Sequence, residues 1–144
     1  MNAIQKLIFI ENKTNYDEFV LSELRPQELV VYHGGFLSPQ KRKFFKKMAA
    51  ALQSQTETVF WADIDLGGFQ MFERLKEIFP TLTPMRMSAE DVTAHHGTGL
   101  VRSEQYLKTV QIALACNQYP LFHMAMKKIL EYGVTIEQEV FLTE

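Results

Sequence analysis

The chain has 144 residues, of which 47% are apolar and 22% are charged, and it carries a formal net charge of −2. This composition is that of an ordinary globular domain with one core, and it excludes a collagen-like chain, a low-complexity chain and a polybasic nucleic-acid-binding tail. A single cysteine, Cys116, excludes an internal disulfide and a zinc site built from cysteines. The apolar run at residues 7–10 is too short to cross a membrane or to form a signal peptide. We therefore expect a cytoplasmic protein that does not contact a membrane.

Short apolar runs alternate with amphipathic stretches along the first two thirds of the chain. The runs predict strands at residues 7–10, 29–33 and 58–62, and a weaker strand within residues 83–87. Amphipathic stretches between them predict helices, and their expected starts are Thr14 with Asp17, Ser38 with Pro39, and Ser88 with Asp91. This alternation is typical of βα units, so it predicts an α/β fold with a central parallel sheet flanked by helices.

The last third of the chain changes character. Residues 103–117 and 120–132 predict two helices, and Gly133 is a suitable stop for the second. Thr135 with Gln138 predicts the cap of a short final helix. We therefore expect a single domain over residues 1–144, divided into an α/β core (residues 1–100) and a helical carboxyl-terminal extension (residues 101–144).

The sharpest chemical feature is the pair Asp63 and Asp65, which follows the third predicted strand and precedes Gly67-Gly68. Side chains two apart on a strand project to the same face, so the two carboxylates lie close enough to repel each other. A hard divalent cation such as Mg²⁺ relieves that repulsion, because it takes oxygen ligands. The alternative is that both acids are solvated loop residues.

Glu11 also stands at the carboxyl end of a predicted strand, directly after residues 7–10. In an open parallel sheet the ligand crevice lies beyond the carboxyl ends of the strands. If the first and third strands are neighbours, Glu11, Asp63 and Asp65 converge on one site. Three acids at such an edge suit metal-assisted phosphoryl chemistry.

These acids sit in a longer pattern that resembles a known family. Glu11 at a strand end with a later Asp-x-Asp is similar to the toprim domain of topoisomerases and primases. The pattern also includes the following residues: Asn12, Lys13, Phe19, Leu24, Gly34-Gly35, residues 61–69, Met87, His95, and Ile136-Glu137-Gln138-Glu139. Over most of the chain it resembles the carboxyl-terminal toprim domain of JetD, the nuclease subunit of Wadjet plasmid defence, and more distantly the A subunit of topoisomerase VI. Two positions depart from these patterns, Ser88 in place of an Asp and Leu66 in place of a Pro.

The resemblance implies a toprim-like fold and Mg²⁺-dependent cleavage of DNA strands, with Mn²⁺ as an alternative cation. Glu11, Asp63 and Asp65 would be its metal ligands and catalytic acids. It also implies partner subunits of an SMC-type defence complex, and an amino-terminal DNA-binding region that this chain does not carry ahead of Glu11. The chain would then be a fragment of a longer protein or a solitary toprim domain. A homodimer is a further expectation, because one such site cuts one strand.

A second feature is a basic group on the predicted helix after Pro39. Arg42, Lys43, Lys46 and Lys47 lie opposite the apolar stripe of that helix. One interpretation is a phosphate-binding face that positions DNA without reading its sequence. The other is an ordinary solvated helix face.

Two further functions compete with the nuclease. One is a non-catalytic toprim-like module that binds nucleic acid or a protein partner. The other is a receiver-like domain that accepts a phosphate on a strand-end Asp. A receiver domain needs a Lys on a late strand, where this chain offers only Arg86 near Met85, so the receiver is the less favoured of the two.

Overall fold

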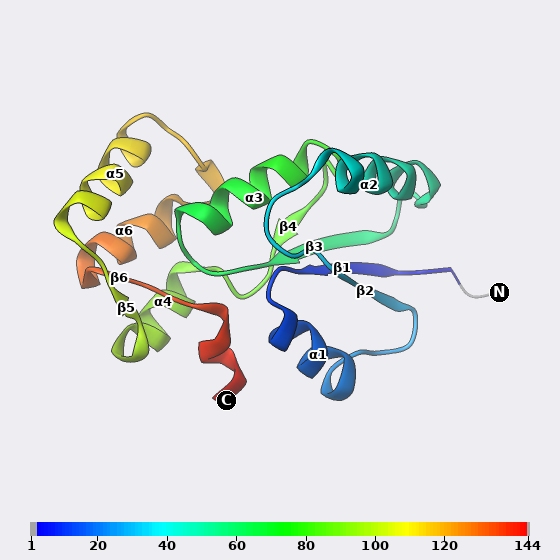
Figure 1. Cartoon of the computed structure of the whole chain (residues 1–144), viewed down its shortest axis with the longest axis horizontal. Helices are drawn as coiled ribbons and strands as arrows, with labels where there is room; N and C mark the ends of the chain where they lie inside the picture. The colour runs from blue at the N-terminus through cyan, green and yellow to red at the C-terminus, as the bar shows by residue number, and fades with distance from the viewer. Residues whose placement is uncertain (1–2, 144) are drawn as a thin grey trace.

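In the computed structural model, which describes residues 3–143, a four-stranded parallel sheet in the order β2-β1-β3-β4 forms the centre of the protein (Figure 1). Its strands are β1 (Lys6–Ile10), β2 (Glu28–Tyr32), β3 (Glu57–Trp61) and β4 (Thr83–Pro84). β1 pairs with both β2 and β3, which confirms that the first and third strands are neighbours. The predicted α/β class, with its toprim-like parallel sheet, is confirmed.

Helices cover both faces of this sheet. α1 (Lys13–Ser22) lies on one face, and α2 (Pro39–Ala51) and α3 (Leu66–Lys76) lie on the other (Figure 1). Because β1 is central and covered on both sides, its last four residues are fully buried, as their uninterrupted apolar sequence predicts. Phe9 of β1 packs edge-on against Phe45 of α2, with ring centroids 5.3 Å apart. The hydrophobic core therefore lies between the sheet and the helices on each of its faces.

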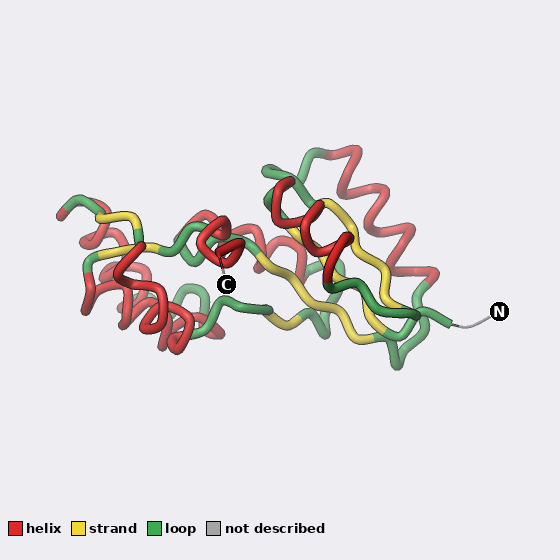
Figure 2. The backbone as a smooth tube through the Cα atoms, turned by 90° about the horizontal axis from the view of Figure 1, so that it is seen from below, coloured by secondary structure: helices red, strands yellow, loops and turns green. Residues whose placement is uncertain are grey.

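The chain after β4 forms a helical end beyond the carboxyl ends of the strands (Figure 2). Its elements are α4 (Ala89–His95), η1 (His96–Thr98), α5 (Glu104–Ala115), η2 (Pro120–Phe122) and α6 (His123–Tyr132). Gly133 ends α6 with a φ of 68°, in the left-handed region that favours glycine. The helices predicted over residues 103–117 and 120–132 are thus confirmed. No helix in the described part of the chain is long and apolar enough to span a membrane.

Two short strands in this region were not predicted. β5 (Leu100–Val101) and β6 (Val134–Thr135) form a two-stranded antiparallel sheet. After β6, Ile136 bridges Ile64 in antiparallel fashion, and the chain closes with η3 (Gln138–Thr143), which packs against α1. The end of the chain is therefore placed against the acid-bearing strand ends.

The expected helix starts are confirmed in two cases and wrong in two. Ser38 caps α2, and Ser88 with Asp91 forms a complete capping box at α4. α1, however, is capped by Asn12 rather than Thr14, because the Asn12 side chain accepts the backbone N–H of residue 15 at 3.0 Å. Thr135 lies in β6, where it pairs with β5 and caps no helix.

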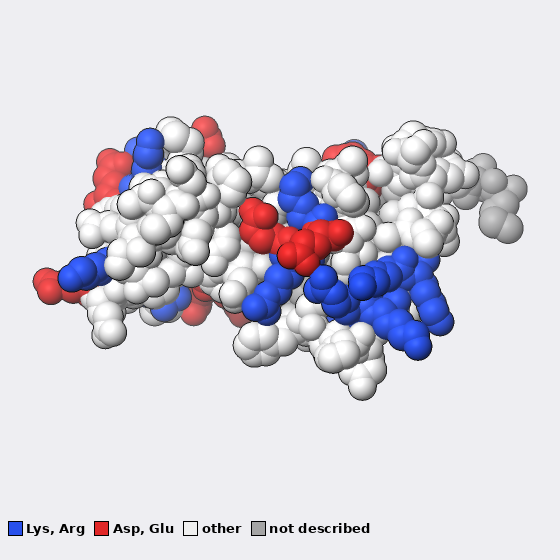
Figure 3. Space-filling model, turned by 90° about the horizontal axis from the view of Figure 1, so that it is seen from above, with Lys and Arg blue, Asp and Glu red and all other residues white. Residues whose placement is uncertain are grey.

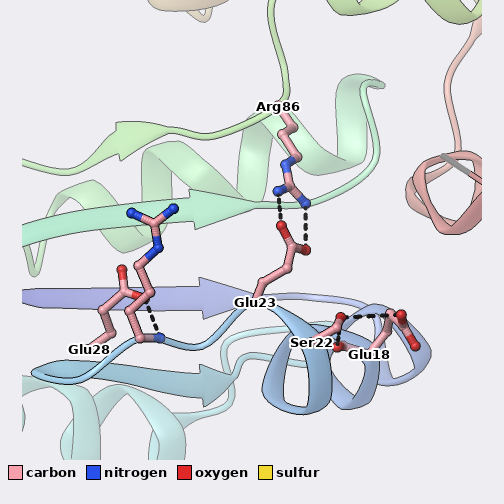
Figure 4. A network of polar contacts seen from close by, with 6 residues as sticks. Glu18, Ser22, Glu23, Glu28 and Arg86 are labelled. Atoms are coloured by element: carbon pink, nitrogen blue, oxygen red, sulfur yellow. Dashed lines mark hydrogen bonds and ion pairs between the residues drawn. The ribbon is translucent and has the colours of Figure 1, made fainter.

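Arg86 ties the loop after β4 to the end of α1. Its guanidinium donates to both carboxylate oxygens of Glu23, at 2.5 and 3.2 Å (Figure 4). The same group lies 4.6 Å from the centroid of the Trp61 ring. Phe141 of η3 contacts that ring edge-on, with centroids 5.6 Å apart. The end of β3, two residues before Asp63, is therefore clamped between the β4–α4 loop and the end of the chain.

Candidate functional site

Glu11, Asp63 and Asp65 all lie at the carboxyl edge of the sheet. β1 and β3 run parallel with Ile10 opposite Trp61, so Glu11 follows one strand where the other also ends. The Glu11 backbone N–H donates to the carbonyl oxygen of Trp61 at 3.0 Å, which extends the pairing of the strands by one residue. The structure thus brings together the strand ends that carry these acids, as the sequence predicts.

Asp65 has a structural role as well as an acidic side chain. It is the N-cap of α3, and its Oδ1 accepts the backbone N–H of Gly68 at 2.7 Å. Its Oδ2 lies 3.6 Å from Nη2 of Arg102, whose Nε donates to Thr135 Oγ1 at 2.7 Å. The carboxylate therefore sits between the positive end of a helix dipole and a guanidinium.

Asp63 is held by the end of the chain. Its Oδ1 accepts the backbone N–H of Gln138 at 2.6 Å. Next to this contact, Nδ2 of Asn12 donates to Glu139 at 2.6 Å, so a further carboxylate is held beside the start of α1. The sequence favours a solvated final helix for Glu137, Gln138 and Glu139 over a segment that reaches back to the acid cluster. The contact between Gln138 and Asp63 supports the second interpretation, to which the family pattern Ile136-Glu137-Gln138-Glu139 was the signal.

The electrostatics show that the acids share one environment. Burial, and then the negative charges of Asp63, Asp65 and Glu139, raise the pKa of Glu11 from 4.5 to about 7, against a lowering by Lys41. Burial is also the main cause that raises the pKa of Asp63 from 3.8 to about 6; the hydrogen bond from Gln138 lowers that pKa, and neighbouring carboxylates raise it. Glu11 and Asp63 are thus carboxyls that gain and lose protons near neutral pH.

Lys41 is a basic side chain, in addition to Arg102, whose charge acts on one of the acids. It lies in the first turn of α2, and its Nζ donates to the carbonyl oxygen of His33 at 2.8 Å. Its charge acts on Glu11, as the lowering of that pKa shows. A lysine in this place can approach an anion that binds at the acidic edge.

The donor set fits a divalent cation in its chemistry but is not arranged as a closed cage. Carboxylate oxygens are the ligands that Mg²⁺ and Mn²⁺ take, and burial followed by neighbouring carboxylates raises the pKa values of Glu11 and Asp63. Within residues 3–143, no group of three or more His, Cys, Asp or Glu side chains is close enough to hold a metal ion. Mg²⁺ usually keeps several waters and uses one or two carboxylates together with substrate phosphates, so a closed protein cage is not required.

The predicted basic group lies on α2, on the face that α2 and α3 form (Figure 3). Lys43, Lys46 and Lys47 are exposed there. Arg42 is half-buried and donates to Glu77 at 2.8 Å. Figure 3 shows Lys and Arg side chains gathered over this helix, with acidic side chains beside them. Three of the four predicted residues therefore present free ammonium groups to solvent, and the fourth is paired.

Comparison with known proteins decides the family. The chain matches the family described as "Wadjet protein JetD, C-terminal" over residues 1–143. The chain belongs to this JetD carboxyl-terminal family. It is also similar to the Wadjet protein JetD of Bacillus cereus (strain Q1), with 29% identity over 140 residues. That alignment covers 96% of this chain and 34% of the relative, so the chain spans about a third of the JetD protein it matches. The family resemblance drawn from the sequence is confirmed.

Proposed function

We propose that the protein cleaves DNA strands in a Mg²⁺-dependent reaction, as the nuclease part of a Wadjet plasmid-defence system. The observation that carries this proposal is the convergence of Glu11, Asp63 and Asp65 on one sheet edge, with the pKa of Glu11 raised to about 7. Membership of the JetD carboxyl-terminal family supports the Wadjet role.

Each acid has a distinct part in this proposal. Asp63 and Asp65 would hold the cation, each with one oxygen already fixed by a backbone N–H. Mg²⁺ bound there would supply Lewis-acid polarisation of the scissile phosphate. Glu11 would complete the site as a further ligand or would move protons, since a carboxyl with a pKa near 7 can act as a general base at neutral pH. Lys41 would face the phosphate from α2.

DNA would approach along the exposed lysines of α2. Contacts from Lys43, Lys46 and Lys47 to phosphates position a duplex without reading its sequence. Each such contact steepens by about 0.9 the slope with which the logarithm of the binding constant falls against the logarithm of the salt concentration. Further partners in this proposal are SMC-type subunits of the defence complex and a second copy of the chain, which would supply the second strand cut.

A second candidate is a non-catalytic module that binds DNA or a protein. The absence of a ready three-ligand metal cluster among residues 3–143 favours it. The two candidates differ in one respect that can be measured, which is whether the acids bind a cation.

The test is a calorimetric titration of Mg²⁺ and Mn²⁺ into the protein and into the double variant Asp63→Asn, Asp65→Asn. Asparagine keeps an oxygen that accepts the Gln138 and Gly68 N–H groups, so the fold is preserved while the charge is lost. Asp17→Asn, at an exposed carboxylate on α1, is the matched control. Binding to the protein and to the control, but not to the double variant, is expected.

Nicking of supercoiled plasmid in Mg²⁺ is then measured with the same variants and with Lys43→Gln, Lys46→Gln. The lysine variant should weaken DNA binding and flatten its salt dependence, whereas Lys108→Gln, Lys127→Gln at exposed positions of α5 and α6 should not. If neither cation binds, with or without DNA, the nuclease proposal is wrong and the non-catalytic module is retained.

A further inference from the structure

We propose that Gln138 is a positioning residue of this site. Its main-chain N–H holds the Asp63 carboxylate, and its buried side chain fixes that N–H relative to the ends of β1 and β3. The inference deepens the proposed function and rests on it, because it assigns how one of the three acids is oriented.

Gln138 uses all of its polar groups near the site. Its backbone N–H donates to Asp63 Oδ1 at 2.6 Å, and its side-chain Oε1 accepts the backbone N–H of Asn12 at 3.1 Å. Its side-chain Nε2 donates to the carbonyl oxygen of Trp61 at 3.3 Å, and its own carbonyl oxygen accepts Nδ2 of Asn15 at 2.9 Å. The side chain is 0% exposed, which is unusual for a glutamine.

These contacts connect three segments that are far apart in the sequence. Asn12 opens α1 directly after Glu11, and Trp61 ends β3 two residues before Asp63. A single amide therefore spans the two strand ends that carry the acids. Two residues earlier, Ile136 and Ile64 exchange backbone hydrogen bonds of 2.8 and 3.2 Å, which brings the segment alongside the acid pair.

The consequence for Asp63 is a fixed carboxylate orientation. The Gln138 N–H holds Oδ1, which sets the plane of the carboxylate, while Oδ2 takes no part in that hydrogen bond. Groups that hydrogen-bond a ligating carboxylate orient it, and their loss commonly weakens metal binding about ten- to a hundredfold. Gln138 therefore acts on the site through Asp63 and not by contact with the reacting atoms.

The test is Gln138→Met, which keeps the length of the side chain and removes both of its hydrogen bonds. The measured quantities are the Mn²⁺ dissociation constant and, in ¹⁵N-labelled protein, the amide resonance of residue 138. Gln111→Met, at an exposed position of α5, controls for the methionine. Ile129→Val, in the buried face of α6, controls for a general loss of stability.

We expect Gln138→Met to raise the Mn²⁺ dissociation constant about ten- to a hundredfold, with Gln111→Met and Ile129→Val close to the unmodified protein. The residue-138 amide resonance should shift in Asp63→Asn, which weakens its acceptor, and this shift should be smaller when Asp63→Asn is combined with Gln138→Met. An unchanged dissociation constant in Gln138→Met, or an equal loss in Ile129→Val, would overturn the inference while leaving the nuclease proposal intact.

If the unmodified protein binds no Mn²⁺, the proposed function fails and the amide resonance alone decides the role of Gln138. A shift on Asp63→Asn that is reduced in the Gln138→Met background supports the role of Gln138 in positioning Asp63. A shift that is absent, or equally large in both backgrounds, overturns that role.

Discussion

Gly68 gives the sharpest test of how the acidic edge is built. It lies in the first turn of α3, where the helix approaches the end of β3. A Cβ at this position would overlap the carbonyl oxygen of Asp63 and stand 3.2 Å from its carbonyl carbon, and both are backbone atoms that cannot turn aside. Gly67 is next to it on the same helix, and its Cβ would meet only Asp65 Oδ1, at an ordinary 3.5 Å.

The same substitution should therefore have opposite effects on the free energy of unfolding at the two glycines. Gly68→Ala should be destabilised by about 1–3 kcal/mol from overpacking and by about 1 kcal/mol from a weakened N-cap hydrogen bond to Asp65, while it gains up to about 1 kcal/mol of helix propensity. Because the clash is with backbone, we place the net loss in the free energy of unfolding at about 2–3 kcal/mol. Gly67→Ala should gain about 0.4–1 kcal/mol.

Urea denaturation measures the stability of both variants, and the urea concentrations at the unfolding midpoints are compared provided that the m-value is unchanged. Gly68→Ala should shift the midpoint down and Gly67→Ala should leave it equal or higher. If the two variants unfold at the same urea concentration, the close approach of α3 to Asp63 is not as described, and the argument for how the acids are placed is refuted.

Two other predictions concern charge and capping. The pKa values of Glu11 and Asp63 are raised on folding, so the folded state binds more protons than the unfolded state between about pH 4 and pH 7. Without divalent cations, the thermal midpoint should therefore fall as the pH rises from 5 to 8, less steeply in Glu11→Gln; an equal slope in both proteins would contradict this. Ser88→Ala removes one half of the capping box of α4 and should lower the free energy of unfolding by about 1 kcal/mol, measured by urea denaturation, whereas Ser54→Ala, in an exposed loop, should not.

Local patterns in the sequence predicted the elements whose causes are local. The strand at residues 7–10 is apolar on both faces because its neighbours and helices cover it, and that burial is visible in the sequence as an uninterrupted run. Ser38 and Ser88 cap helices through hydrogen bonds that reach three residues along the chain, so they too can be predicted from the sequence alone.

The errors have both local and distant causes. Asn12 displaces Thr14 as the cap of α1 through a hydrogen bond that reaches only three residues, so that error was a choice between two local candidates. The bonds of Asn12 to Gln138 and Glu139, more than 120 positions later, have no local signal. β5 and β6 have two residues each, too few for an alternating pattern to register. The placement of Glu11, Asp63 and Asp65 at strand ends was predictable because strand ends follow from local pattern, whereas the contact of the closing segment with Asp63 depends on the tertiary fold.

The proposed cation site depends on how the acids are held, because the described residues, 3–143, contain no ready group of three ligands. Burial, and then the charges of neighbouring carboxylates, raise the pKa of Glu11 to about 7 and that of Asp63 to about 6, so both are partly protonated in neutral solution. Hydrogen bonds hold both Asp side chains in place: Asp63 accepts the Gln138 N–H, and Asp65 accepts the Gly68 N–H as the cap of α3. A ligand that binds only the folded state stabilises the folded protein, by about 2.7 kcal/mol at a concentration one hundred times its dissociation constant. A divalent cation has the charge and the oxygen preference to be that ligand, and DNA phosphates can supply the oxygens that the protein leaves open.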